Sequence, residues 1–131
     1  MTARRADTRS RGRAGEDEAV RHLESLGYRV LARNQVTRAG EIDIVAAEGD
    51  TLCFVEVKAR RSSRHGPAVA AVGPAKQRRL ARAAALYLAA LGPSAGRVEV
   101  RFDVLGLELD GTVWRHHLVR DAFAAEALFT V

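Results

Sequence analysis

Cysteine is almost absent from this 131-residue chain, in which Cys53 is the single thiol. One thiol excludes an intramolecular disulfide and a zinc cluster built from cysteines, and it fits a reducing, cytoplasmic environment. The chain has no apolar run long enough to cross a bilayer and no signal-peptide core, so we expect no membrane segment. Its length allows one domain with a substantial core, but not two.

Lysine is the scarce basic residue. Of the 21 lysines and arginines, only Lys58 and Lys76 are lysines, so a position that needs only positive charge is expected to hold arginine. Lys58 therefore indicates a requirement for a compact ammonium group, or for one whose pKa can shift on burial. The net charge of +5 and the pI of about 10.3 favour a polyanionic partner, such as DNA or another nucleic acid.

The first thirteen residues carry five arginines and almost no apolar side chains. We predict a disordered basic arm over residues 1–13, followed by a single domain over residues 14–131. The arm either contacts phosphates or is a solvated terminus, and its composition leaves both interpretations open.

The stretch from residue 40 to residue 58, GEIDIVAAEGDTLCFVEVK, is typical of two β-strands joined by a tight turn. Glycine followed by aspartate at positions 49 and 50 predicts a two-residue type II′ turn. In that register Asp43 lies opposite Glu56, and Glu41 lies opposite Lys58. A three-residue loop or a bulge would shift the pairing by one position.

Two carboxylates that face each other across a sheet are about 5 Å apart at Cβ and repel one another. Asp43 and Glu56 also stand in strands apolar enough to be buried, where an unpaired charge is unfavourable. A divalent cation such as Mg²⁺, bound between the two carboxylates, would offset both their repulsion and the unfavourable burial of their charge. Lys58 projects to the same face as Glu56. The alternative is a solvated strand face with a Glu41–Lys58 ion pair, and spacing alone decides neither.

Two helices flank this hairpin in the sequence. The apolar spacing predicts a helix over residues 14–26, in which Glu16 falls on the inward face. There Glu16 either approaches the site or stabilises the helix N-terminus electrostatically. A second helix is predicted over residues 75–91, with Gln77 at the head of its inward stripe.

Basic residues crowd the first half of that second helix. A helix N-terminus with several cations is a good site for a phosphate, although a solvated face of an arginine-rich protein is the alternative. We add the basic residue at the end of the second hairpin strand to this group. The candidate nucleic-acid-binding residues are Lys76, Arg78, Arg79, Arg82 and Arg60.

The predicted order is a helix, three strands, a helix, two strands and a short helix. The remaining elements are strands over residues 28–34, 97–109 and 112–118, a loop over 62–74 and a helix over 122–128. The long helix between the third and fourth strands implies a right-handed parallel crossover. The result is an α/β fold with a mixed central sheet flanked by helices.

Several motifs together resemble one family. GEDEA, GEIDIV, FVEVKAR, KQRR and RFDVLGLE, spread over residues 14–110, are similar to the bacterial YraN family of endonuclease-like proteins. That family resembles the PD-(D/E)xK nuclease superfamily, whose restriction-endonuclease-like core is αβββαβ, and the motif order is also similar to that of archaeal Holliday-junction resolvases. Superfamily enzymes often carry proline directly before the aspartate, whereas Ile42 precedes Asp43 here.

This resemblance implies a metal site on the hairpin. Asp43 and Glu56 would be ligands of Mg²⁺ or Mn²⁺, with the backbone carbonyl of Val57 as a third ligand. Lys58 would position or activate the attacking water and stabilise developing charge on the phosphate.

The resemblance also implies roles for the helix residues and a function. Glu16 would assist the metal or its waters, and Gln77 would orient the substrate or Lys58. We therefore expect a Mg²⁺-dependent nuclease that hydrolyses phosphodiester bonds in DNA, on branched or damaged substrates. Cutting two strands of a junction would require a homodimer. The alternative is a non-catalytic module on a nuclease-like fold that binds nucleic acid or docks a partner.

Overall fold

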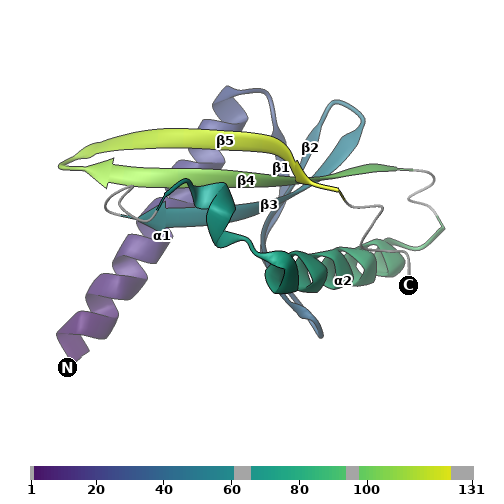
Figure 1. Cartoon of the computed structure of the whole chain (residues 1–131), viewed down its shortest axis with the longest axis horizontal. Helices are drawn as coiled ribbons and strands as arrows, with labels where there is room; N and C mark the ends of the chain where they lie inside the picture. Colours follow the sequence, from purple (N-terminus) through teal and green to yellow (C-terminus); the bar gives the residue numbers. More distant parts are fainter. Residues whose placement is uncertain (1, 61–65, 94–97, 125–131) are drawn as a thin grey trace.

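The computed structural model describes residues 2–60, 66–93 and 98–124, with side chains from residue 13 onward. Its elements are α1 (Thr2–Ser25), β1 (Arg29–Thr37), β2 (Gly40–Glu48), β3 (Thr51–Arg60), the 3₁₀ segment η1 (Ala68–Ala71), α2 (Pro74–Leu91), β4 (Glu99–Asp110) and β5 (Val113–Phe123). The strands form one sheet in the order β1-β2-β3-β4-β5 (Figure 1). Only β3 and β4 are parallel, because α2 connects them as a crossover.

Each face of the sheet is covered by one helix. On one face α2 and η1 enclose a core that includes Phe54 and Phe102. On the other face α1 places Leu23 against Ile44 and Leu105. This arrangement confirms the predicted α/β fold with a mixed central sheet flanked by helices. In the described part of the chain, no helix is both long and apolar enough to span a membrane.

The β2–β3 hairpin has the predicted register. Glu48 pairs with Thr51, and the ladder continues to the pair of Ile44 and Val55. Gly49 has φ of 60°, the left-handed conformation that the first position of a type II′ turn requires. The two-residue turn is therefore confirmed.

Helix α1 begins much earlier than predicted. It starts at Thr2 rather than at residue 14, so the helix runs through the segment for which we predicted a disordered arm. The segment is rich in arginine and alanine, which are good helix formers, and this propensity explains the difference. The first turns of α1 project beyond the sheet (Figure 1). The division into arm and domain stays a prediction.

The end of the described chain also differs from the prediction. Strand β5 continues through Phe123, whose ring stacks on Phe102 with centroids 4.8 Å apart. The helix predicted over residues 122–128 is therefore wrong at its first three positions, because 122 and 123 lie in β5 and 124 follows it outside any helix; residues 125–128 lie outside the described residues. Aromatic packing onto the core favours a strand there instead of a helix.

One buried carboxylate, Asp103 of β4, is enclosed by donors. It is 1% exposed and accepts hydrogen bonds from Tyr28 Oη at 2.8 Å, Arg101 Nε at 2.8 Å and the Asp121 N–H at 2.9 Å. Arg101 also contacts Glu48 Oε1 at 2.7 Å. Because these donors satisfy Asp103, its role is to join β4 and β5 to the residue directly before β1, and we assign it no chemistry.

Candidate metal centre and basic surface

Asp43 and Glu56 meet where the β2–β3 ladder stops. Ile42 packs in the core on the α2 side, whereas Ile44 packs on the α1 side. Residues two apart in a regular strand share a face, so β2 is irregular at Asp43. At this irregularity the Asp43 carboxylate accepts a hydrogen bond from the Val57 N–H at 2.9 Å. It also lies within hydrogen-bonding reach of the Glu56 carboxyl. The structure thus brings the two predicted acids together.

The carboxyl pair is shielded from water. The pKa of the Asp43 carboxyl is raised from 3.8 to about 7, first by burial and then by the nearby charge of Glu56, while the hydrogen bond from the Val57 N–H opposes the change. The Glu56 side chain is only 8% exposed. Near neutral pH, in the absence of a cation, Asp43 is therefore partly protonated beside Glu56.

Among the described side chains, Lys76 is the cation that forms an ion pair with this site. Its Nζ lies 2.6 Å from Glu56 Oε1, and the side chain reaches over from the first turn of α2. We predicted Lys76 as a phosphate-binding residue. In the structure its ammonium group forms an ion pair with Glu56, a contact between distant segments that spacing in the sequence does not reveal, and phosphate binding by Lys76 stays a prediction.

Lys58 lies next to the carboxyl pair, and its ammonium group has no polar partner among the described residues. It follows Glu56 by two positions on β3 and is half-buried, so its side chain projects to the same face. Within the described residues it makes no hydrogen bond or ion pair. The alternative ion pair with Glu41 is not formed: Glu41 is exposed and pairs with Val36 of β1.

Glu16 and Gln77 do not join the carboxyl pair. Glu16 Oε2 accepts a hydrogen bond from Asn34 Nδ2 at 3.1 Å, and its side chain is 31% exposed. It therefore flanks the buried stripe of α1 rather than lying on it. Gln77 Nε2 donates to the Val72 carbonyl at 2.9 Å, which holds the segment before α2. Their expected contacts with the metal site and with Lys58 are absent from the described structure.

The donor set fits a hard divalent cation. In the part of the chain that the structure describes, no group of three His, Cys, Asp or Glu side chains is placed to hold a metal. Mg²⁺, however, is usually bound by one or two carboxylates and several waters. Asp43 and Glu56 supply those two carboxylates, and the role of the Val57 carbonyl stays a prediction.

The basic residues of α2 form a surface beside the turn between β1 and β2. Arg78, Arg79 and Arg82 are exposed. The stem of Arg79 covers Gly40, where an added Cβ would lie 3.3 Å from Arg79 Cδ. Arg82 and Arg38 border a depression of about 480 Å³. This surface can accept a polyanion without disturbing the core.

A cluster of one carboxylate and two imidazoles between α1 and β5 was not predicted from the sequence. Glu18 has a side chain only 10% exposed, and its Oε2 lies 2.6 Å from His116 Nε2. The His116 ring stacks on His22, with centroids 3.9 Å apart. Burial, and then the neighbouring His116, lower the pKa of His22. The position of Glu18 directly before the inward Ala19 is the one signal that could have revealed the cluster.

Comparison with known proteins identifies the family. Residues 15–107 match the family described as "Uncharacterised protein family UPF0102". The UPF0102 protein STH1475 of Symbiobacterium thermophilum is 50% identical over 116 residues, which cover 87% of this chain and 96% of that protein. A UPF0102 protein of Syntrophus aciditrophicus is 44% identical over 112 residues, covering 86% and 87% of the two chains. The chain therefore belongs to the UPF0102 family, in agreement with the YraN-like motifs of its sequence.

Proposed function

We propose that this protein is a Mg²⁺- or Mn²⁺-dependent nuclease that hydrolyses phosphodiester bonds in DNA. The observation that carries the proposal is the half-buried Asp43 carboxyl, whose pKa is raised, beside the buried Glu56 carboxyl. Two adjacent carboxyls in a low-dielectric site are unfavourable unless a cation joins them, and strongly shifted pKa values cluster at functional sites.

The neighbouring side chains have suitable chemistry. Asp43 and Glu56 would hold the ion, and the Val57 N–H would keep Asp43 oriented. When bound, the ion would supply Lewis acidity to the phosphate and lower the pKa of a bound water. Lys58, which has no competing partner in the described residues, would donate hydrogen bonds to a phosphate oxygen that gains negative charge.

The fold supports placement in the PD-(D/E)xK superfamily. Its expected αβββαβ order matches α1, β1, β2, β3, α2 and β4. The candidate acids stand on the second and third strands, and the lysine of the ExK motif follows on the third. The basic α2 surface lies beside this site, where it would hold the phosphate backbone. Cutting two strands of a junction would require a homodimer.

Cleavage assays test the proposal directly. Supercoiled plasmid, linear duplex and four-way junction are incubated with Mg²⁺ or Mn²⁺ and with wild type, Asp43→Asn, Glu56→Gln or Lys58→Met. We expect cleavage by the wild type and a loss of at least a hundredfold in each variant. Cleavage that survives Asp43→Asn, or no cleavage of any DNA by the wild type, contradicts the proposal.

A second candidate function is a non-catalytic module that binds nucleic acid or docks a partner. It is favoured by the ion pair of Lys76 with Glu56 and by the separation of Glu16 from the carboxyl pair. It predicts salt-dependent DNA binding that Asp43→Asn leaves unchanged, and no heat of Mn²⁺ binding in calorimetry. A measurable divalent-cation site at Asp43 would exclude it.

A further inference from the structure

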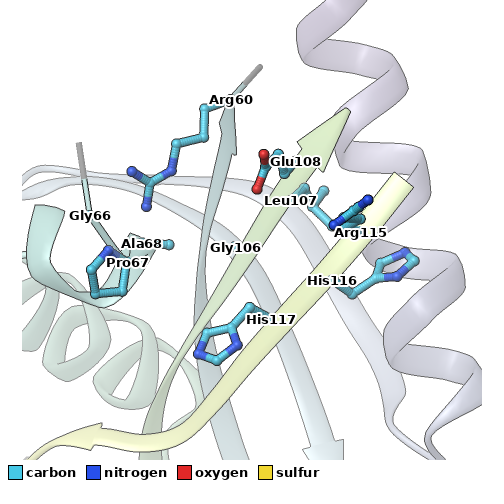
Figure 2. A pocket seen from close by; sticks show the side chains of 10 residues that line it. All are labelled: Arg60, Gly66, Pro67, Ala68, Gly106, Leu107, Glu108, Arg115, His116 and His117. Atoms are coloured by element: carbon cyan, nitrogen blue, oxygen red, sulfur yellow. The ribbon is translucent and has the colours of Figure 1, made fainter. Parts of the chain in front are cut away.

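A pocket of about 410 Å³ lies beyond Lys58, between η1 and the ends of β3, β4 and β5 (Figure 2). We call it the η1 pocket and define it by Arg60, Pro67, Ala68, Glu108 and His117. Figure 2 shows Arg60 reaching from β3 toward Pro67 and Ala68, while His116 points away toward α1. The volume falls in the range of sites for small organic ligands.

The strand register puts this pocket on the same face as the candidate metal centre. Arg60 is two residues beyond Lys58, so their Cα atoms are roughly 7 Å apart and their side chains share a face. Across the sheet, Arg60 pairs with Glu108, and Gly106 pairs with both Lys58 and His117. A chain of phosphates leaving Lys58 along β3 would therefore reach the η1 pocket next.

Gly106 shapes the floor of the pocket. A Cβ at this position would lie 2.7 Å from the Ala68 Cβ, so only glycine lets η1 pack against β4 here. Ala68 itself is buried. The floor is therefore apolar and closely packed, which suits the face of a planar ring.

The polar groups around this floor are uncommitted. In the described part of the chain, Arg60, Glu108 and His117 make no hydrogen bond or ion pair. The other two polar residues at the pocket are engaged elsewhere: Arg115 pairs with Asp110 at 3.1 Å, and His116 pairs with Glu18. The pocket thus presents a guanidinium, a carboxylate and an imidazole above an apolar floor.

This combination selects one class of ligand. A bare phosphate would bind Arg60 but would be repelled by Glu108. A nucleotide satisfies both, because its phosphate accepts hydrogen bonds from Arg60 and the amino group of its base donates to Glu108, as the cytosine N4 donates to acidic side chains. The base would rest on Pro67 and Ala68. His117 would stack on it or bind its sugar–phosphate.

We propose that the η1 pocket binds one unpaired nucleotide of the substrate strand, with a base that carries an amino group. A base can enter such a pocket only when it is outside the duplex stack, so the substrate class becomes DNA with an extrahelical or single-stranded nucleotide beside the scissile bond. The inference rests on the proposed function for the position of that bond, but nucleotide binding itself requires no cleavage.

The test measures binding without catalysis. Isotope-labelled protein in EDTA is titrated with dCMP and with inorganic phosphate, and backbone NMR shifts report the site and the affinity. We expect shifts at the η1 pocket with dCMP, and weaker binding of phosphate. Arg60→Ala should weaken dCMP binding about tenfold, the loss of one charge-assisted hydrogen bond. Arg29→Ala, at an exposed arginine on β1, is the matched control and should have no effect.

Glu108→Gln decides between a nucleotide site and a plain anion site. It removes a negative charge, so a plain anion site predicts tighter binding, whereas a site that reads a base amino group predicts binding weakened several-fold. Glu99→Gln on the same strand is the control. Tighter dCMP binding by Glu108→Gln, phosphate binding equal to that of dCMP, or no shifts at the pocket overturns the proposal.

A second measurement separates this proposal from the nuclease proposal. Duplexes with and without one extrahelical cytosine are compared for binding in EDTA and for cleavage with Mn²⁺. The pocket is supported and the nuclease is contradicted if three results hold together. The duplex with the extrahelical cytosine binds more tightly, Arg60→Ala removes this preference, and neither duplex is cleaved. Cleavage of both duplexes at equal rates, unchanged in Arg60→Ala and Glu108→Gln, contradicts the pocket alone.

Discussion

Replacing Asp43 by asparagine should stabilise the fold at neutral and alkaline pH while removing metal binding. Asparagine has the shape of a protonated aspartate, and its carbonyl can still accept the Val57 N–H. In the folded wild type the pKa of Asp43 is raised from 3.8 to about 7, mainly by burial. The folded state therefore holds this proton more tightly than the unfolded state, and the free energy of unfolding falls as the pH rises from about 4 to about 7.

The size of this effect follows from the pKa change. A change of that extent corresponds to at most about 4 kcal/mol, and the proton is shared with Glu56, so we expect Asp43→Asn to be more stable than wild type by about 2–4 kcal/mol at pH 8. Toward pH 4 the difference should shrink to less than about 1 kcal/mol, because the folded wild type is then fully protonated at Asp43 and the unfolded state is close to its own pKa of 3.8.

Urea unfolding followed by circular dichroism, in EDTA at intervals from pH 4 to pH 8, measures the difference. Adding Mn²⁺ at pH 8 should stabilise the wild type but not Asp43→Asn. Glu99→Gln, at an exposed position on β4 that does not contribute to the Asp43 shift, is the control and should show no pH-dependent difference from wild type. A difference between Asp43→Asn and wild type that is constant with pH, or a less stable Asp43→Asn at pH 8, refutes the electrostatic argument.

Three further predictions concern the surroundings of the site. Lys76→Met leaves a buried carboxylate without its cation, so we expect a loss of about 2 kcal/mol in EDTA that Mn²⁺ reverses, whereas the exposed Arg78→Met should be neutral in urea unfolding; a stable Lys76→Met without metal contradicts this. Tyr28→Phe removes the hydrogen bond that Tyr28 donates to the buried aspartate of β4 and the one that it accepts from Arg101, so it should cost about 1–2 kcal/mol without changing the calorimetric Mn²⁺ affinity; a changed affinity would link that network to the site. Gly106→Ala forces η1 away from β4 and should cost about 1–3 kcal/mol, while Gly73→Ala, where an added Cβ meets nothing within 4 Å, should cost less than about 0.5 kcal/mol; equal melting temperatures for the two variants would contradict the packing argument.

The hairpin was predictable because its determinants are local. Gly49 and Asp50 define a two-residue turn, the turn defines the register, and the register places Asp43 near Glu56. The apolar period of α2 and the parallel crossover follow from equally short-range patterns. The family match is consistent with the motif string that runs through these elements.

The contacts around the acids were less predictable because they depend on where elements dock. The partner of Glu56 is Lys76, twenty positions later on a helix, and helix rotation decides whether that lysine faces the sheet or the solvent. Glu16 does not reach the Asp43–Glu56 pair, because α1 is rotated so that Glu18 points inward instead. A rotation of one residue on a helix moves a side chain by about 100°, more than a periodicity argument resolves.

The most direct measurement is the anomalous diffraction of Mn²⁺ in a crystal of the full chain soaked with MnCl₂ near pH 8. We expect a peak between the Asp43 and Glu56 carboxylates, with Lys76 released from Glu56. A crystal that shows no anomalous peak there, with Lys76 still paired to Glu56 at millimolar Mn²⁺, would contradict the central claim that these two carboxylates form a divalent metal site.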